Sequence, residues 1–107
     1  MRILLDECVN MHLRREIPRH RVFTVEYMGW KSLKNGELLS RAAESFDIFL
    51  TIDGNIPTQQ PLERFDIAVF VLKTKSNLLR NLVPFVPPLM LAAQNPVKGR
   101  ATVIELP

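Results

Sequence analysis

The sequence predicts an α/β protein built as a three-layer α/β/α sandwich, with a mainly parallel central sheet of four to five strands. Two observations lead to this class. Continuous apolar runs, which are typical of strands buried on both faces, occur at Ile3-Leu4-Leu5 and at Ile48-Phe49-Leu50. Segments with apolar residues at helical spacing alternate with the strands, and this alternation predicts right-handed crossovers with helices on both faces of a parallel sheet.

The length and composition predict one domain, residues 1–107, with a well-formed hydrophobic core. Apolar residues make up 47% of the chain, which excludes a disordered protein. No apolar run approaches the ~20 residues that a bilayer requires, so no membrane partner is expected. Met1 leads directly into a strand, which leaves no room for a signal peptide, and a single cysteine excludes an internal disulfide. We therefore expect a cytoplasmic protein, and its net charge of +3 admits nucleic acid as a partner.

Five segments have the composition of strands, because they are short, apolar or β-branched, and bounded by turn residues. They are residues 2–5, 21–25, 47–52, 66–72 and 101–105. The fourth is the most hydrophobic, and Gly99 precedes the last.

Helical segments are expected between the strands. A short helix over residues 10–17 has Asn10 as a candidate cap and is ended by Pro18. A longer helix over residues 35–45 consists of good helix formers, with Asn35 as its candidate N-cap. Residues 57–64 form a weak helix or a loop.

The stretch from residue 76 to 94 is predicted to form two separate helices. Ser76 is a candidate cap, and three prolines, at positions 84, 87 and 88, interrupt the helical pattern because proline lacks an amide proton. Leu78, Leu79 and Leu82 are expected to face the sheet or a second copy of the chain, so a homodimer is one of the assemblies considered.

Three acidic residues come from separate elements that meet at one edge of the predicted sheet. Asp6 follows the first strand and Asp53 the third, and ligands of parallel α/β sheets bind outside the carboxyl ends of the strands. The helix that begins at Asn35 starts at the same edge and brings Glu37 there. Three carboxylates in one place are costly unless a hard divalent cation neutralises them, and such oxygen-rich sites suit Mg²⁺ or Mn²⁺. We expect Asp6, Glu37 and Asp53 to hold this cation and to be the catalytic residues of phosphate-ester hydrolysis.

Each of these acids also has a structural interpretation. Residues 53–55, Asp-Gly-Asn, form a good turn sequence, Glu37 suits the helix dipole, and Asp6 suits a cap of the following helix. Asp47 and Asp66 precede their strands, so they belong to the opposite edge and are excluded from the site.

The motifs that carry the acids resemble the short PIN-like proteins related to VapC-type ribonuclease toxins. The resemblance rests on Leu4-Leu5-Asp6-Glu7, on Gly29 ahead of Glu37-Leu38-Leu39, and on Leu50-Thr51-Ile52-Asp53. The fourth strand, the proline-broken stretch and the late Gly99 extend it over nearly the whole chain.

This resemblance implies a PIN-like sandwich and Mg²⁺- or Mn²⁺-dependent cleavage of RNA. It assigns the metal to Asp6, Glu37 and Asp53, with Glu7, Asn35, Thr51 and Asn55 as supporting polar groups. Many relatives sit beside a small helix-turn-helix antitoxin, which is the partner that the resemblance implies. The chain departs from the family at Cys8, where Asn is frequent, and at Asn35 and Asn55, where acids are common. These departures imply fewer charges at the metal.

The densest basic segment is a candidate for holding the RNA backbone. It contains Arg14, Arg15, Arg19 and Arg21. A solvated helix face and loop is the alternative. His12 and His20 have no partner at metal-ligand spacing and are expected on the surface or in packing. Cys8 is expected to be a small buried residue, and Trp30 to fix its loop.

Two other classes of protein compete with the nuclease. A receiver-like signalling domain also has an acid pair after its first strand, an acid after its third and a late Lys, roles that Asp6, Glu7, Asp53 and Lys73 would fill. Lys73 follows the fourth strand, one unit too early for this class. The third class is a PIN-like module that binds a partner without catalysis, which the neutral Asn35 and Asn55 favour.

Overall fold

The computed structural model describes residues 1–107 and contains one sheet of five parallel strands, which confirms the α/β class. The strands are β1 (Arg2–Leu5), β2 (Arg21–Thr24), β3 (Ile48–Thr51), β4 (Ala68–Leu72) and β5 (Ala101–Ile104). Their order across the sheet is β2-β1-β3-β4-β5. The two strands that carry the acids, β1 and β3, are therefore neighbours at the middle of the sheet, with Leu5 opposite Leu50.

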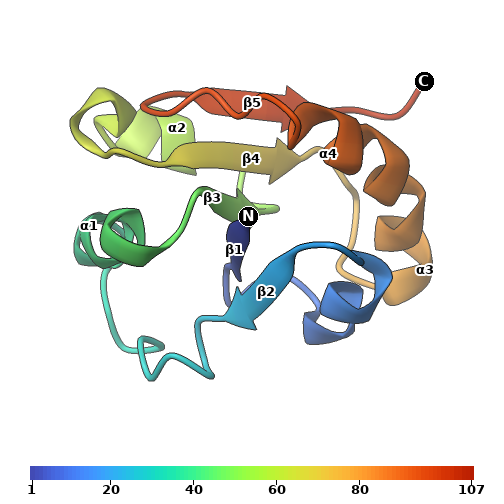
Figure 1. Cartoon of the computed structure of the whole chain (residues 1–107), viewed down its shortest axis with the longest axis horizontal. Helices are drawn as coiled ribbons and strands as arrows, with labels where there is room; N and C mark the ends of the chain where they lie inside the picture. The colour runs from blue at the N-terminus through green and yellow to red at the C-terminus, as the bar shows by residue number, and fades with distance from the viewer.

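Helices cover both faces of the sheet (Figure 1), as predicted. One face carries α1 (Asn35–Ser45), α2 (Ile56–Gln59) and the 3₁₀ turn η2 (Leu62–Arg64). The other carries η1 (Met11–Glu16), α3 (Leu79–Leu82), η3 (Val83–Phe85) and α4 (Val86–Ala92).

The core consists of two apolar clusters separated by the sheet. Ile3 and Leu5 of β1 belong to one cluster and Leu4 to the other, because successive side chains of a strand point to opposite faces. All three are completely buried. This explains the continuous apolar run that begins the sequence, since both faces of β1 are covered.

Two of the three predicted caps are wrong. Asn10 accepts a hydrogen bond from the His12 amide at 3.0 Å and caps η1, although this segment is a 3₁₀ helix. Asn35 is the first residue of α1, and the extended Lys34 precedes it without a side-chain cap. Ser76 lies two residues before Leu78, the N-cap position of α3, and its hydroxyl accepts from the Leu78 amide at 3.2 Å. It therefore organises the loop instead of capping the helix.

The proline-rich stretch is divided into separate helices, as predicted, with the 3₁₀ turn η3 between α3 and α4. Pro87 and Pro88 lie in the first turn of α4, where amide protons have no partner within the helix, so they begin the helix. Leu82 is fully buried and Leu79 packs against the same core. Leu78 is 46% exposed and does not face the sheet, so for this residue the alternative, contact with a second copy of the chain, stays a prediction.

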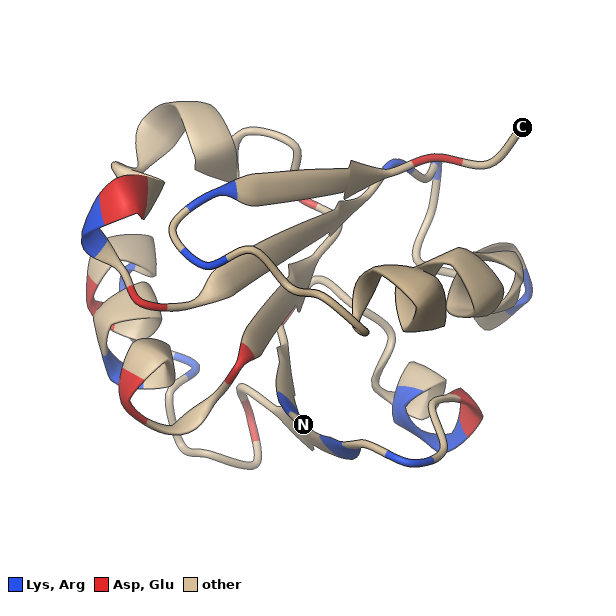
Figure 2. Cartoon of the chain, turned by 45° about the horizontal axis from the view of Figure 1, so that its top comes forward, with Lys and Arg blue, Asp and Glu red and all other residues tan.

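Charged residues lie on helices, loops and strand ends, which leaves the strand interiors apolar (Figure 2). At the amino edge, the Asp47 carboxylate accepts from the Arg2 amide at 2.9 Å, and Asp66 pairs with Lys98 at 3.8 Å. Both acids thus lie away from the carboxyl edge, as expected. None of the helices has the length and apolar character needed to cross a membrane.

Candidate functional site

Asp6 and Asp53 lie together at the carboxyl edge of the sheet. Asp6 directly follows β1, and its amide donates to the Leu50 carbonyl of β3 at 2.9 Å. Asp53 follows β3 by two residues. Both line a shallow depression of about 600 Å³, together with Glu7, Cys8 and Ile52. We call this depression the acidic hollow.

Thr51 connects the two acids. It is the one buried polar residue of the chain, with no exposed surface, so its hydroxyl needs hydrogen-bond partners within the protein. The hydroxyl donates to Asp6 Oδ2 at 2.7 Å and accepts from the Asp53 amide at 3.0 Å. The last residue of β3 therefore fixes the orientation of one carboxylate and the start of the turn that carries the other.

Each carboxylate keeps unused acceptor capacity. Asp6 Oδ1 accepts from the Glu7 amide at 2.8 Å, and Asp53 Oδ1 accepts from the Asn55 amide at 2.9 Å. A carboxylate oxygen has two lone pairs, and Asp53 Oδ2 receives no hydrogen bond from the chain. Two half-buried carboxylates with free oxygen lone pairs fit Mg²⁺ or Mn²⁺, because these cations take one or two protein carboxylates and complete their shell with water or phosphate.

Cys8 belongs to this network as a neutral thiol. Its Sγ donates to Asp6 Oδ2 at 3.5 Å and lies 3.5 Å from Thr51 Oγ1. Burial raises the pKa of the Cys8 thiol, and the charge of Asp6 adds to this effect, while hydrogen bonds from Thr51 and the Ile52 backbone act against it. Since the thiolate is the reactive form, this environment favours a packing role for Cys8 over a nucleophilic one.

Glu37 lies outside the acidic hollow. It is in the first turn of α1, where its Oε1 is 3.4 Å from Arg41 Nη2, and its side chain is 56% exposed. No three His, Cys, Asp or Glu side chains gather closely enough to hold a metal. The structure thus brings two of the three predicted acids together. Among the supporting residues, Glu7 and Thr51 contact the pair, Asn55 contributes its amide, and Asn35 is half-buried at the start of α1.

The basic segment runs away from the acidic hollow. Arg21 is the first residue of β2 and therefore lies at the amino edge, and Arg19 precedes it in a turn with φ of 76°. Arg14 and Arg15 are exposed in the last turn of η1. A crossover between parallel strands must return from the carboxyl edge to the amino edge, which is why this segment ends opposite the site.

Trp30 is half-buried and packs edge-on against Phe46, with ring centroids 6.1 Å apart. The ring thus fixes the loop between β2 and α1, as expected.

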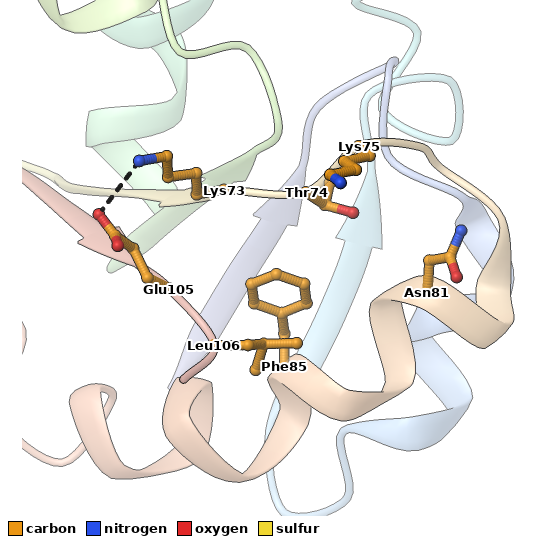
Figure 3. Close-up of a pocket in the computed structure, with 7 residues that line it drawn as sticks. All are labelled: Lys73, Thr74, Lys75, Asn81, Phe85, Glu105 and Leu106. Atoms are coloured by element: carbon orange, nitrogen blue, oxygen red, sulfur yellow. Dashed lines mark ion pairs between the residues drawn. The ribbon is translucent and has the colours of Figure 1, made fainter.

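Sequence reasoning missed a second depression at the same edge, which we call the lysine pocket (Figure 3). Its lining includes Lys73, Lys75, Asn81, Phe85, Glu105 and Leu106. The signal in the sequence is the pair of lysines, Lys73 and Lys75, just after the fourth strand. The Lys73 ammonium lies 3.6 Å from Glu105 Oε1.

Comparison of the chain with models of protein families, with curated proteins and with solved structures found no match.

Proposed function

We propose that the chain is a metal-dependent ribonuclease of the PIN-like type. The observation that carries the proposal is the pairing of Asp6 and Asp53 in the acidic hollow, joined through the buried Thr51 hydroxyl. A sheet of this kind binds its ligands outside the carboxyl ends of the strands, which is where both acids lie. The resemblance of the motifs around them to PIN-like ribonucleases supplies the reaction.

Asp6 and Asp53 would hold Mg²⁺ or Mn²⁺. Glu37 lies outside the acidic hollow, and its role as a third ligand rests on the family resemblance alone. The cation would supply charge neutralisation at the scissile phosphate and activation of the attacking water. Thr51 and the Glu7 amide orient Asp6, so the carboxylate is positioned before substrate arrives. Glu7 lines the same hollow and its carboxylate makes no ion pair, which suits it to accept the proton of the water.

We propose further that the protein is the toxin component of a toxin–antitoxin pair, with RNA as substrate and a small helix-turn-helix protein as partner. This part rests on the family resemblance alone. A small DNA-binding protein encoded in the neighbouring reading frame, and its co-purification with this chain, would support it. A neighbouring frame of unrelated character would count against it.

Cleavage of a labelled single-stranded RNA tests the nuclease. Wild type should cleave slowly with Mn²⁺ or millimolar Mg²⁺, and Asp53→Asn and Asp6→Asn should each lower the rate by at least about a hundredfold, as expected for loss of a group that stabilises transition-state charge. Asp66→Asn, at the amino edge, is the matched control and should keep the wild-type rate. Equal cleavage by all variants would identify a contaminant, and its absence in wild type would leave the non-catalytic module.

The strand order favours one second candidate. The order β2-β1-β3-β4-β5 is that of receiver domains, in which Asp53 would accept phosphate. The ion pair of Lys73 with Glu105 counts against it, because the Lys of such a site should face the acids. Incubation with a small phosphodonor and Mg²⁺ separates the two candidates. A gain in intact mass that Asp53→Asn abolishes would establish the receiver function.

A further inference from the structure

Three neighbouring depressions lie along the carboxyl edge of the sheet and share lining residues. The acidic hollow lies at β1 and β3, and the lysine pocket lies at β4 and β5 against α3. A third depression lies between them and shares Ile52 with the acidic hollow and Lys73, Thr74 and Glu105 with the lysine pocket. The charged lining residues therefore change from acids at β1 and β3 to two lysines and one acid at β4 and β5.

The lysine pocket combines the groups that recognise a nucleotide. Its volume is about 560 Å³, and Phe85 and Leu106 form an apolar wall (Figure 3). Asn81 offers an amide at the rim, where its Nδ2 donates to Ser76 Oγ at 2.6 Å and its Oδ1 makes no hydrogen bond with the chain. Unstacked bases of single-stranded RNA are bound by apolar contact and by hydrogen bonds to their edges.

The charges of this pocket are not all neutralised. Glu105 pairs with Lys73 at 3.6 Å, whereas Lys75 is exposed and makes no ion pair. One ammonium group thus remains for an anionic ligand. A phosphate is the anion expected beside a pocket of nucleotide size.

The loop that carries Lys75 is attached to the acidic hollow. Asn77 Nδ2 donates to the carbonyl of Cys8 at 3.4 Å, which ties the loop after β4 to the loop after β1. The strands β1 and β4 are separated by β3 alone, so their ends lie roughly 10 Å apart, two strand spacings. An extended strand crossing the edge would reach both places.

We infer that the lysine pocket binds one nucleotide of the RNA strand, with its phosphate at Lys75 and its base between Phe85, Leu106 and Asn81, while the scissile phosphate lies at Asp6 and Asp53. This inference rests on the proposed function and names the residues that hold the substrate. It also places the strand along the carboxyl edge, whereas the basic segment of residues 14–21 ends at the amino edge.

The test measures binding of a short labelled single-stranded RNA by fluorescence anisotropy, in EDTA so that no cleavage occurs. Lys75→Gln should weaken binding several-fold and reduce the dependence of log affinity on log salt concentration by roughly 0.7 to 1. Leu106→Asp, at a position that is 40% exposed, should weaken binding without disturbing the core. Arg100→Gln is the matched control, because it removes one positive charge at the amino edge and should change nothing.

Adenosine monophosphate, added as a competitor, separates a strand-binding pocket from a free-nucleotide site. If wild type binds the nucleotide and does not bind the RNA, the strand inference is overturned. If wild type cleaves RNA but Lys75→Gln and Leu106→Asp bind it as wild type does, the pocket inference fails and the proposed function stands. Absence of both RNA binding and RNA cleavage in wild type overturns the two together.

Discussion

Thr51 links the two acids of the site through a single hydroxyl group. Its hydroxyl is completely buried, donates to Asp6 and accepts from the amide of Asp53. A buried hydroxyl in an apolar core is retained at a cost unless it is fully hydrogen-bonded. Its position at the end of β3 therefore links the fold to the orientation of the two acids.

Replacing Thr51 by Val should lower the free energy of unfolding by about 1–2 kcal/mol, because Val keeps the shape but leaves the Asp53 amide without its acceptor and Asp6 Oδ2 with only the weak Cys8 thiol as donor. Urea denaturation measures this. Thr102→Val is the control, since Thr102 is half-buried and its hydroxyl makes no hydrogen bond within the chain, so little loss is expected. Equal losses of stability in Thr51→Val and Thr102→Val would show that the hydrogen bonds of the Thr51 hydroxyl do not stabilise the fold.

His20 provides a pH-dependent prediction. Its Nδ1 is buried without a hydrogen-bond partner, and burial lowers its pKa below the usual 6.5. The unfolded chain therefore takes up the proton first as the pH falls, and folding stability is lost below about pH 6.5. The free energy of unfolding of wild type, relative to that of His20→Gln, should decrease as the pH is lowered from about 7.5 to about 5.5. A constant difference over this range would contradict the burial of an uncharged imidazole.

The elements were predictable because their local signals agreed with their tertiary surroundings. Helix α1 and strand β1 have the predicted bounds of residues 35–45 and 2–5, and the other four strands are one or two residues shorter than predicted. Caps were harder to predict. Asn35 and Ser76 have side chains that can cap a helix, but the N-cap position is Lys34 in α1 and Leu78 in α3. The exposure of Leu78 depends on the path of the loop after β4 across the carboxyl edge of the sheet. The local sequence pattern does not encode this path.

Two glycines should respond in opposite directions to substitution by alanine. Gly36 lies in the first turn of α1, and an added Cβ would meet only the flexible end of Gln60, at 3.3 Å. Gly36→Ala should therefore stabilise the protein by about 0.5–1 kcal/mol. Gly99 has φ of 81°, a left-handed conformation, so Gly99→Ala should destabilise it by about 1–2 kcal/mol. Thermal or urea unfolding checks both signs, and a destabilised Gly36→Ala would show that the Gln60 side chain cannot move away from the added Cβ.

At the scale of the whole molecule, the sequence predicted which edge of the sheet carries the acids but not how side chains meet there. Asp6 and Asp53 could be placed together because both follow strands of a parallel sheet, and the order β1-β3 makes them neighbours. Glu37 lies in a helix that begins at the same edge, yet its carboxylate pairs with Arg41, one turn further along α1. The lysine pocket requires β4, α3 and the chain after β5 to converge, and that convergence exists only in three dimensions.

The central claim is that Asp6 and Asp53 share one divalent cation, and titration calorimetry with Mn²⁺ tests it most directly. Wild type should bind one ion. Asp6→Asn and Asp53→Asn should each weaken binding by at least about tenfold, the lower bound for losing even a supporting group of a metal site. Asp66→Asn, an acid of the amino edge that pairs with Lys98, should bind as wild type does. Mn²⁺ affinity unchanged in both Asp6→Asn and Asp53→Asn, with all variants folded by circular dichroism, would contradict the shared site.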